Sequence, residues 1–192
     1  MPRRPDPRIL AAAGLAVVTA AVWWWAQPDS TGTDPVVVID GVGDTSSRPT
    51  APDLAGEALP DIALLALDGR TVGLASLAGT PMVLNVWAST CAPCRAEMPA
   101  LQRFAEEYTG RVTVVGVDPL DDAAELQAFA AAVAVTYPLY RDPNGELLVE
   151  FGITDLPTTL FVRADGTVAA VHLGALEDGE LRSLVATELG VG

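Results

Sequence analysis

The sequence contains no lysine, a single histidine and only two cysteines. Eleven arginines face twenty-five acidic residues, which gives a formal net charge of −14. So acidic a balance argues against nucleic acid as a partner and against an anionic membrane surface held by charge alone, because both need a basic surface. The few cysteines and the lone histidine exclude most zinc sites, which take four such ligands or three plus water. They also exclude a scaffold built on several disulfides.

A run of 18 residues without charge, 9–26, lies close to the N-terminus. As a helix it would be about 27 Å long, which reaches the lower end of what spans a bilayer core. Three arginines precede the run, and the first four charged residues after it are aspartates. The positive-inside rule therefore predicts a cytoplasmic segment 1–8, a transmembrane signal anchor 9–26 and an extracytoplasmic remainder.

A cleaved signal peptide is the alternative to this anchor. Cleavage requires small residues at positions −1 and −3, and a cut after Ala26 would place Trp24 at −3. A cut after Ala20, which places Val18 at −3, is passable but falls inside the apolar run. The triplet 23–25 is all tryptophan, as in an interfacial aromatic belt, so the anchor is favoured.

Residues 27–57 are rich in Pro, Gly, Ser, Thr and Asp, which predicts an extracytoplasmic linker with one β-prone stretch at Val36–Ile39. Apolar runs and turn residues then alternate through a predicted domain, 58–192. We expect strands at 62–67, 71–74, 82–87, 112–117, 158–162 and 167–171, and a short apolar stretch at 137–140. We expect helices at 93–108, from a cap at Asp121 or Asp122 to about 133, at 146–151 and at 176–189. This order predicts an α/β fold with a central mixed sheet flanked by helices.

The two cysteines form a C-x-x-C pair, Cys91 and Cys94, directly after the strand predicted at 82–87 and at the start of a helix. Free N–H groups and the positive end of the helix dipole favour a thiolate there, so the pKa of Cys91 should fall below about 8.5. Pro93 suits a first helical turn, and Arg95 adds a positive charge. Cys91 is the expected nucleophile toward a partner's disulfide, and Cys94 would then resolve the mixed disulfide.

Three other interpretations of the cysteine pair are weaker. A structural disulfide that closes so short a loop would constrain the unfolded chain little. A metal site would need more ligands, and His172 is the only histidine. Haem attachment requires a histidine after the second cysteine, where Arg95 stands. Redox chemistry is therefore the favoured interpretation.

The sequence around the pair resembles the thioredoxin superfamily, and within it the membrane-anchored TlpA/ResA-type thiol-disulfide oxidoreductases. The resemblance covers about residues 59–189. It rests on Trp87 before the C-x-x-C motif, on residues 97–99 (Glu-Met-Pro) behind it, and on residues 151–153 (Phe-Gly-Ile) and 156–159 (Leu-Pro-Thr-Thr). A thioredoxin-like fold is thereby implied.

The resemblance also implies roles for single residues. Pro157 matches the family's cis-proline, and we expect it to bind an incoming peptide together with Leu156 and Trp87, although Trp87 also fits an ordinary core position. Glu97 is expected to relay the proton of Cys94, because Asn85 stands where cytoplasmic thioredoxins carry a buried aspartate. The alternative for Glu97 is a solvated glutamate paired with a nearby arginine.

The expected function is therefore thiol-disulfide exchange by a monomer that needs no cofactor beyond the Cys91–Cys94 pair. The family suggests reduction of extracytoplasmic cysteine proteins such as apocytochrome c, with electrons from a membrane thiol carrier of the CcdA/DsbD kind. An oxidant would use the same residues, so the direction stays open. A copper-binding assembly factor is a weaker alternative, since such proteins use C-x-x-x-C with a downstream histidine, here His172. A peroxidase of the peroxiredoxin type is disfavoured because its Pro and Thr are not in register before Cys91.

Overall fold

The structure is a computed structural model that describes residues 50–192. The predicted anchor at 9–26, the β-prone stretch Val36–Ile39 and most of the predicted linker lie outside the described residues. Among residues 50–192, no helix combines the length and the apolar character that crossing a bilayer requires.

A single seven-stranded sheet runs through the described part of the chain, in the order β2-β1-β5-β4-β3-β6-β7. The three neighbours β3, β4 and β5 are parallel, and the remaining pairs are antiparallel. The sheet is therefore mixed, as predicted. Its strands are β1 (Ala63–Ala66), β2 (Thr71–Gly73), β3 (Met82–Val86), β4 (Thr113–Asp118), β5 (Leu139–Arg141), β6 (Thr158–Val162) and β7 (Val168–Leu173).

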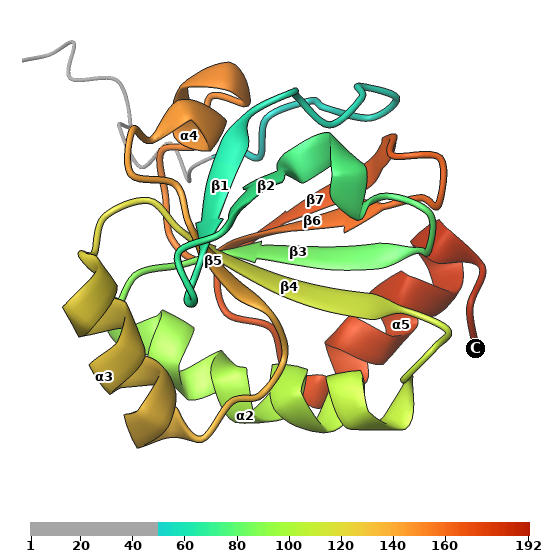
Figure 1. Cartoon of the computed structure of the whole chain (residues 1–192). Helices are drawn as coiled ribbons and strands as arrows, with labels where there is room; N and C mark the ends of the chain where they lie inside the picture. The colour runs from blue at the N-terminus through green and yellow to red at the C-terminus, as the bar shows by residue number, and fades with distance from the viewer. Residues whose placement is uncertain (1–49) are drawn as a thin grey trace, which may run out of the picture. The chain divides into compact units, whose positions relative to one another are not determined.

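Helices cover both faces of the sheet and make a three-layered α/β arrangement (Figure 1). One face carries three α-helices, and the other carries a short α-helix and a 3-10 turn. The first set is α2 (Ala92–Glu107), α3 (Ala123–Val133) and α5 (Asp178–Leu189), and the second is α4 (Glu146–Glu150) and η1 (Leu74–Leu77).

The interior strand β3 explains why the sheet needs cover on both sides. All five of its residues are buried. Successive side chains of a strand point to opposite faces, so Val83 packs under α2 and α5 while Leu84 packs toward α4. A near-continuous apolar strand of this kind is typical of a sheet that is buried on both faces.

The strand register brings three segments to one edge of the sheet. Because β3 and β4 are parallel, with Val86 opposite Val117, their carboxyl ends lie side by side. The antiparallel strand β6 begins opposite the same end, with Thr158 across from Val86. The loop into α2, the loop after β4 and the segment before β6 therefore meet at this edge.

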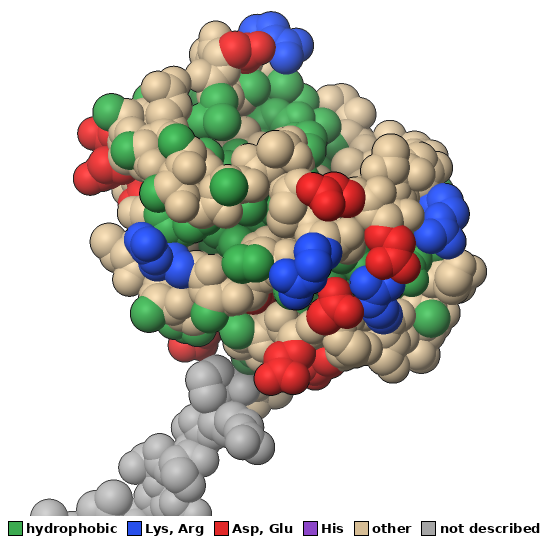
Figure 2. Space-filling view, turned by 90° about the horizontal axis from the view of Figure 1, so that it is seen from below, with side chains coloured by type: hydrophobic (Ala, Val, Ile, Leu, Met, Phe, Trp, Pro, Cys, Tyr) green, Lys and Arg blue, Asp and Glu red, His purple; other side chains and the backbone are tan. Residues whose placement is uncertain are grey.

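Arg182 ties α5 to α2 on the helical face. Its guanidinium donates to both carboxylate oxygens of Glu107, at 2.6 and 2.7 Å, and its Nε donates to Asp178 at 2.9 Å. On the face seen in Figure 2, basic and acidic side chains lie interspersed, with apolar side chains between them. Despite the net negative charge of the chain, acidic side chains therefore do not form a continuous negative patch on this face.

Several boundaries differ from the prediction, among them the following three. The chain joins the fold before residue 58, because Gly56 N donates to Val168 O and Val168 N donates to Glu57 O. The strand predicted to reach Leu74 stops at Gly73, because the fully buried Leu74 begins a 3-10 turn. The last helix begins at Asp178 rather than at residue 176.

Candidate active site

Cys91 and Cys94 form a disulfide at the start of α2, with their Cα atoms 5.3 Å apart. Cys91 is the N-cap residue, and its Sγ accepts a hydrogen bond from Cys94 N at 3.2 Å. Pro93 occupies the first turn, where no N–H is required. Cys91 is half-buried whereas Cys94 has no exposed surface. Only Cys91 can therefore be reached by a partner, and its sulfur lies where the helix N-terminus stabilises negative charge.

The turn that leads into Cys91 is held by hydrogen bonds from two sides. Trp87 N donates to Val117 O at 3.0 Å, which continues the pairing of β3 with β4. Cys91 N donates to Ala88 O at 3.1 Å and closes the turn. Ser89 N donates to the side chain of Asp121, with a distance of 2.7 Å to Oδ2.

Glu97 lies one helical turn beyond Cys94 and is 2% exposed. Asn85 Nδ2 donates to its Oε1 at 2.8 Å, and the main-chain N of Leu176 donates to its Oε2 at 2.9 Å. Asn85 Nδ2 also contacts Thr159 Oγ1 at 3.0 Å. The alternative of a solvated, arginine-paired glutamate is therefore wrong.

Burial raises the pKa of Glu97 from 4.5 to about 7, although the hydrogen bonds from Leu176 N and Asn85 oppose the shift. Desolvation penalises the charged form, whereas donors to a carboxylate favour it. A carboxyl group with such a pKa can take up and release a proton near neutral pH.

Pro157 lies directly before β6 and its peptide bond with Leu156 is cis, as the resemblance implies. Pro157 O accepts from Gly174 N at 2.8 Å, which fixes this segment against the end of β7. Pro157 is buried, whereas Leu156 keeps part of its surface exposed. The strand register places both beside the end of β3, from which the turn to Cys91 departs.

Trp87 has no exposed surface, so its side chain does not contact a bound peptide, and the prediction that it binds substrate is corrected here. Its ring stacks on Phe129 of α3, with centroids 4.7 Å apart, and the Arg95 guanidinium lies 5.1 Å from the Phe129 centroid. Gly116 makes room for the indole, since a Cβ there would lie 2.9 Å from Trp87 Nε1. Trp87 therefore supports the site from the core side.

Two aspartates at the end of β4 were not predicted as part of the site. Asp121 was one of two candidates for the cap of α3, but Asp122 makes that cap, because its Oδ1 accepts from Ala124 N and Glu125 N. Asp121 instead binds Ser89 N. The available signal was topological: Asp118 ends the strand parallel to the one that precedes the cysteines.

His172 lies on β7 opposite Thr159 and its Nδ1 is 3.7 Å from Glu180 Oε1. Among residues 50–192, His, Cys, Asp and Glu side chains nowhere gather in threes that could hold a metal ion.

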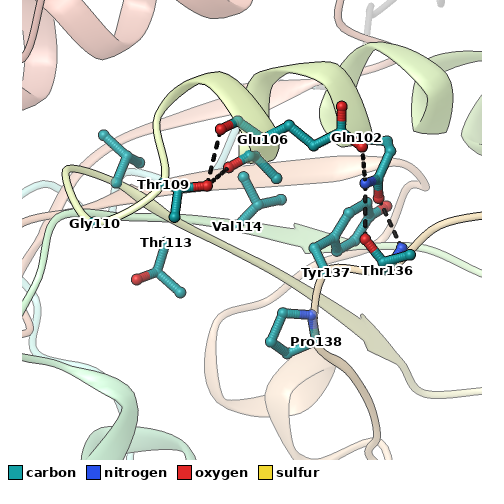
Figure 3. Close-up of a pocket in the computed structure, with 11 residues that line it drawn as sticks. Gln102, Glu106, Thr109, Gly110, Thr113, Val114, Thr136, Tyr137 and Pro138 are labelled. Atoms are coloured by element: carbon teal, nitrogen blue, oxygen red, sulfur yellow. Dashed lines mark hydrogen bonds between the residues drawn. The ribbon is translucent and has the colours of Figure 1, made fainter.

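A shallow pocket of about 270 Å³ lies elsewhere, along the second half of α2 (Figure 3). Gln102 on its rim exchanges two hydrogen bonds with Thr136, from Gln102 Nε2 to Thr136 Oγ1 and from Thr136 N to Gln102 Oε1. Glu106, also on the rim, is about 22 Å along the helix from Cys91 at 1.5 Å per residue. The pocket is therefore not part of the cysteine site.

Comparison with known proteins agrees with this geometry. The model of the AhpC/TSA family matches residues 55–171. The thioredoxin-like protein YneN of Bacillus subtilis is 30% identical over 129 residues, which cover 66% of this chain and 75% of YneN. The thiol-disulfide oxidoreductase ResA of Oceanobacillus iheyensis is 35% identical over 126 residues, which cover 63% of this chain and 66% of ResA.

The solved structure of the thiol:disulfide interchange protein DsbE from Chlorobium tepidum has a TM-score of 0.65 at 27% identity, and the match covers 71% of this chain and 98% of that one. The fold is therefore thioredoxin-like. The chain belongs to the AhpC/TSA family and, within it, to the thioredoxin-like thiol-disulfide oxidoreductases of the ResA and DsbE type.

Proposed function

We propose that this chain is a membrane-tethered reductant outside the cytoplasm, which passes electrons through Cys91 and Cys94 to disulfides of secreted cysteine proteins, apocytochrome c among them. The observation that carries the proposal is the asymmetry of the pair. Cys91 is half-buried at the helix N-terminus, Cys94 is fully buried, and the buried acid Glu97 lies one turn further along.

In the first step, the Cys91 thiolate attacks one sulfur of the partner's disulfide. A new S–S bond forms between Cys91 and the partner while the partner's own S–S bond breaks. The leaving sulfur departs as a thiolate and takes up a proton. Leu156 and Pro157, beside the end of β3, are proposed to hold the peptide during this step.

In the second step, Cys94 gives up its proton and attacks Cys91 Sγ, which releases the partner's second sulfur. Glu97 is the proposed acceptor of that proton, since its pKa of about 7 lets it act near neutral pH. The chain is then a disulfide and the partner a dithiol, so two electrons have moved. A membrane thiol carrier of the CcdA/DsbD kind is proposed to reduce the pair again, and no cofactor is required.

The proposed location is supported by the sequence, and the proposed disulfide exchange by likeness to named relatives. The apolar run 9–26 with its arginine-rich N-terminal flank favours a tether with the catalytic domain outside the cytoplasm. The relative ResA is named a thiol-disulfide oxidoreductase, and the relative DsbE is named a thiol:disulfide interchange protein. We propose that the protein works as a monomer, and an oxidant on the same residues is the second candidate.

The redox potential of the full chain tests the direction. The chain is equilibrated with glutathione mixtures of known ratio and its thiols are then trapped and counted. A potential below about −220 mV supports the reductant, whereas one near −120 mV supports the oxidant.

Single cysteine variants test the order of attack. Cys91→Ser should abolish reduction of a model disulfide, whereas Cys94→Ser should accumulate mixed disulfides with the partner. Retained activity in both variants would contradict the mechanism. Copper titration of the reduced chain, beside His172→Ala, tests the metal alternative: stoichiometric binding lost in that variant would favour it.

A further inference from the structure

Two buried aspartates, Asp118 and Asp121, lie next to the turn that precedes Cys91. Asp118 is the last residue of β4 and has no exposed surface, and Asp121 is 8% exposed in the loop that follows. Asp118 Oδ1 accepts from Leu120 N at 2.8 Å and from Asp121 N at 3.0 Å. These bonds fold the loop so that both carboxyl groups lie together.

The carboxyl group of Asp121 connects this pair to the cysteine site. Its Oδ2 accepts from Ser89 N at 2.7 Å, only two residues before Cys91. Charge-assisted bonds of this length are among the stronger hydrogen bonds in proteins. The contact is the only side-chain hydrogen bond in the described structure that reaches the main chain between β3 and Cys91.

Asp118 Oδ2 is buried and has no hydrogen-bond partner among the described groups. Two ionised carboxylates cannot hydrogen-bond to each other, because neither carries a proton to donate. A proton held between Asp118 and Asp121 would give Asp118 Oδ2 its hydrogen bond. The electrostatics agree: burial first, and then the contact with Asp121, raise the pKa of Asp118 well above its ordinary value. Burial alone would raise the pKa of Asp121, but the contacts with Asp118 and Ser89 hold it below its ordinary value. The proton therefore belongs on Asp118.

The other charges around the pair do not replace this proton. Arg141, at the end of β5, donates through Nε to the main-chain O of Asp121, and its charge also helps to keep the Asp121 carboxylate ionised. Asp142 is engaged by the main-chain N–H groups of Glu146 and Leu147. Asp122 and Glu125, which follow Asp121 along the chain, form the capping box of α3.

We propose that Asp118 and Asp121 form a proton-sharing pair that positions the turn before Cys91, with Asp121 as the contact to Ser89 N and Asp118 as the donor that holds Asp121 in place. This proposal rests on the proposed function of Cys91 as the attacking group. Both aspartates are positioning residues, since neither carries the reacting sulfur. Loss of the shared proton places two negative charges side by side, so the Asp121–Ser89 contact loosens when Asp118 ionises.

Amide hydrogen exchange at Ser89 in the full chain tests the proposal without any substrate. Asp121→Ala should speed exchange of the Ser89 amide at least tenfold, because the acceptor is gone. In the unmodified chain, protection of this amide, corrected for intrinsic exchange, should fall at least threefold between pH 6 and pH 8.5. Asp118→Asn keeps a donor toward Asp121 but does not titrate, so protection in this variant should stay level over the same range.

Asp122→Asn is the matched control, because it removes a neighbouring carboxylate and keeps a good helix cap. Its Ser89 protection should follow that of the unmodified chain. If Asp121→Ala does not fold, Asp121→Asn replaces it, and because its acceptor is uncharged the Ser89 amide should exchange faster than in the unmodified chain.

Unchanged Ser89 protection in the Asp121 variants would overturn the positioning role. A pH-dependent fall that persists in Asp118→Asn would overturn the shared proton. As a second readout, the pH profile of Cys91 alkylation in the reduced chain should change in Asp121→Ala and not in Asp122→Asn. An unchanged profile would show that the two aspartates do not act on Cys91. If Ser89 amide exchange behaves as expected but Cys91 and Cys94 exchange no disulfide, only the proposed function is contradicted.

Discussion

Glu97 is a carboxyl group whose two oxygens are both hydrogen-bonded inside the protein, yet no arginine among residues 50–192 forms an ion pair with it. We expect Glu97→Gln to slow the release of a mixed disulfide at pH 7 by tenfold or more, since general acid-base groups contribute about 10²–10⁴-fold. The ionisation near pH 7 should also disappear from the pH profile of this step. Rapid-mixing measurements of partner release from the reduced chain give both quantities.

Glu106→Gln is the control for that substitution, because Glu106 is an exposed glutamate on the same helix whose side chain accepts a hydrogen bond from Gln102 Nε2. It should leave the rate and its pH profile unchanged. A normal rate in Glu97→Gln would remove the proton relay from the mechanism while leaving the two cysteines in place.

Asn85 is the second residue whose role can be isolated. Its amide donates to Glu97 and to Thr159, and hydrogen bonds to a carboxylate lower its pKa. Asn85→Ala should therefore move the ionisation of Glu97 above about pH 7 and cost about 1–3 kcal/mol of unfolding free energy, because buried groups lose their partner. An NMR titration of the Glu97 side-chain carboxyl carbon measures the first effect, and an ionisation that does not move would contradict it.

At the scale of the elements, the sequence was sufficient to predict a helix or strand wherever its local pattern agrees with its burial in the structure. The buried run that became β3, the strand β6 and a cap of α3 at Asp121 or Asp122 were all predictable from apolar spacing and turn or cap residues, although the choice of Asp122 was not. The start of α5 was not, because Leu176, two residues before the helix, is held by a bond from its main-chain N to Glu97, 79 positions away. Such long-range bonds leave no local signal.

The absence of a local signal for long-range bonds also explains which parts of the active site the sequence predicts. The C-x-x-C pair and Glu97 share one helix, so spacing alone places them together. Asp121 reaches Ser89 only because β3 and β4 are parallel and end at the same edge, which spacing does not reveal. The burial of Trp87 under Phe129 likewise depends on how α3 packs.

Helix α3 provides a prediction at this scale. Its capping box satisfies main-chain N–H groups at the first turn, and replacement of such a cap by alanine costs about 0.5–2 kcal/mol. Asp122→Ala should lower the unfolding free energy by about that amount, whereas Asp122→Asn should change it little. Urea unfolding followed by circular dichroism measures both, and equal losses in the two variants would show that the cap is not the cause.

At the scale of the whole molecule, the buried acids make stability depend on pH in an unusual direction. A carboxyl group whose pKa is raised on folding binds its proton more tightly in the folded chain, so its contribution is complete below the unfolded pKa and is lost as the pH rises to the folded value. For Glu97 that window runs from 4.5 to about 7, and Asp118 adds an effect of the same sign. The exposed Glu107 and the half-buried Asp178, both paired with Arg182, have lowered pKa values, so they act only at more acidic pH.

We therefore expect the oxidised chain to lose unfolding free energy between pH 5 and pH 8, with Glu97 alone contributing up to about 3 kcal/mol at about 1.4 kcal/mol per pKa unit. In Glu97→Gln this part of the slope should vanish, and in the double variant with Asp118→Asn the profile should be nearly flat. Urea unfolding at several pH values across the window measures the slope of unfolding free energy against pH. Subtracting the slope of the variant from that of the unmodified chain removes the contribution of the groups that both contain. A slope that is unchanged in the double variant would mean that neither acid is protonated inside the folded protein, and the proton relay at Glu97 would then have to be abandoned together with the shared proton at Asp118.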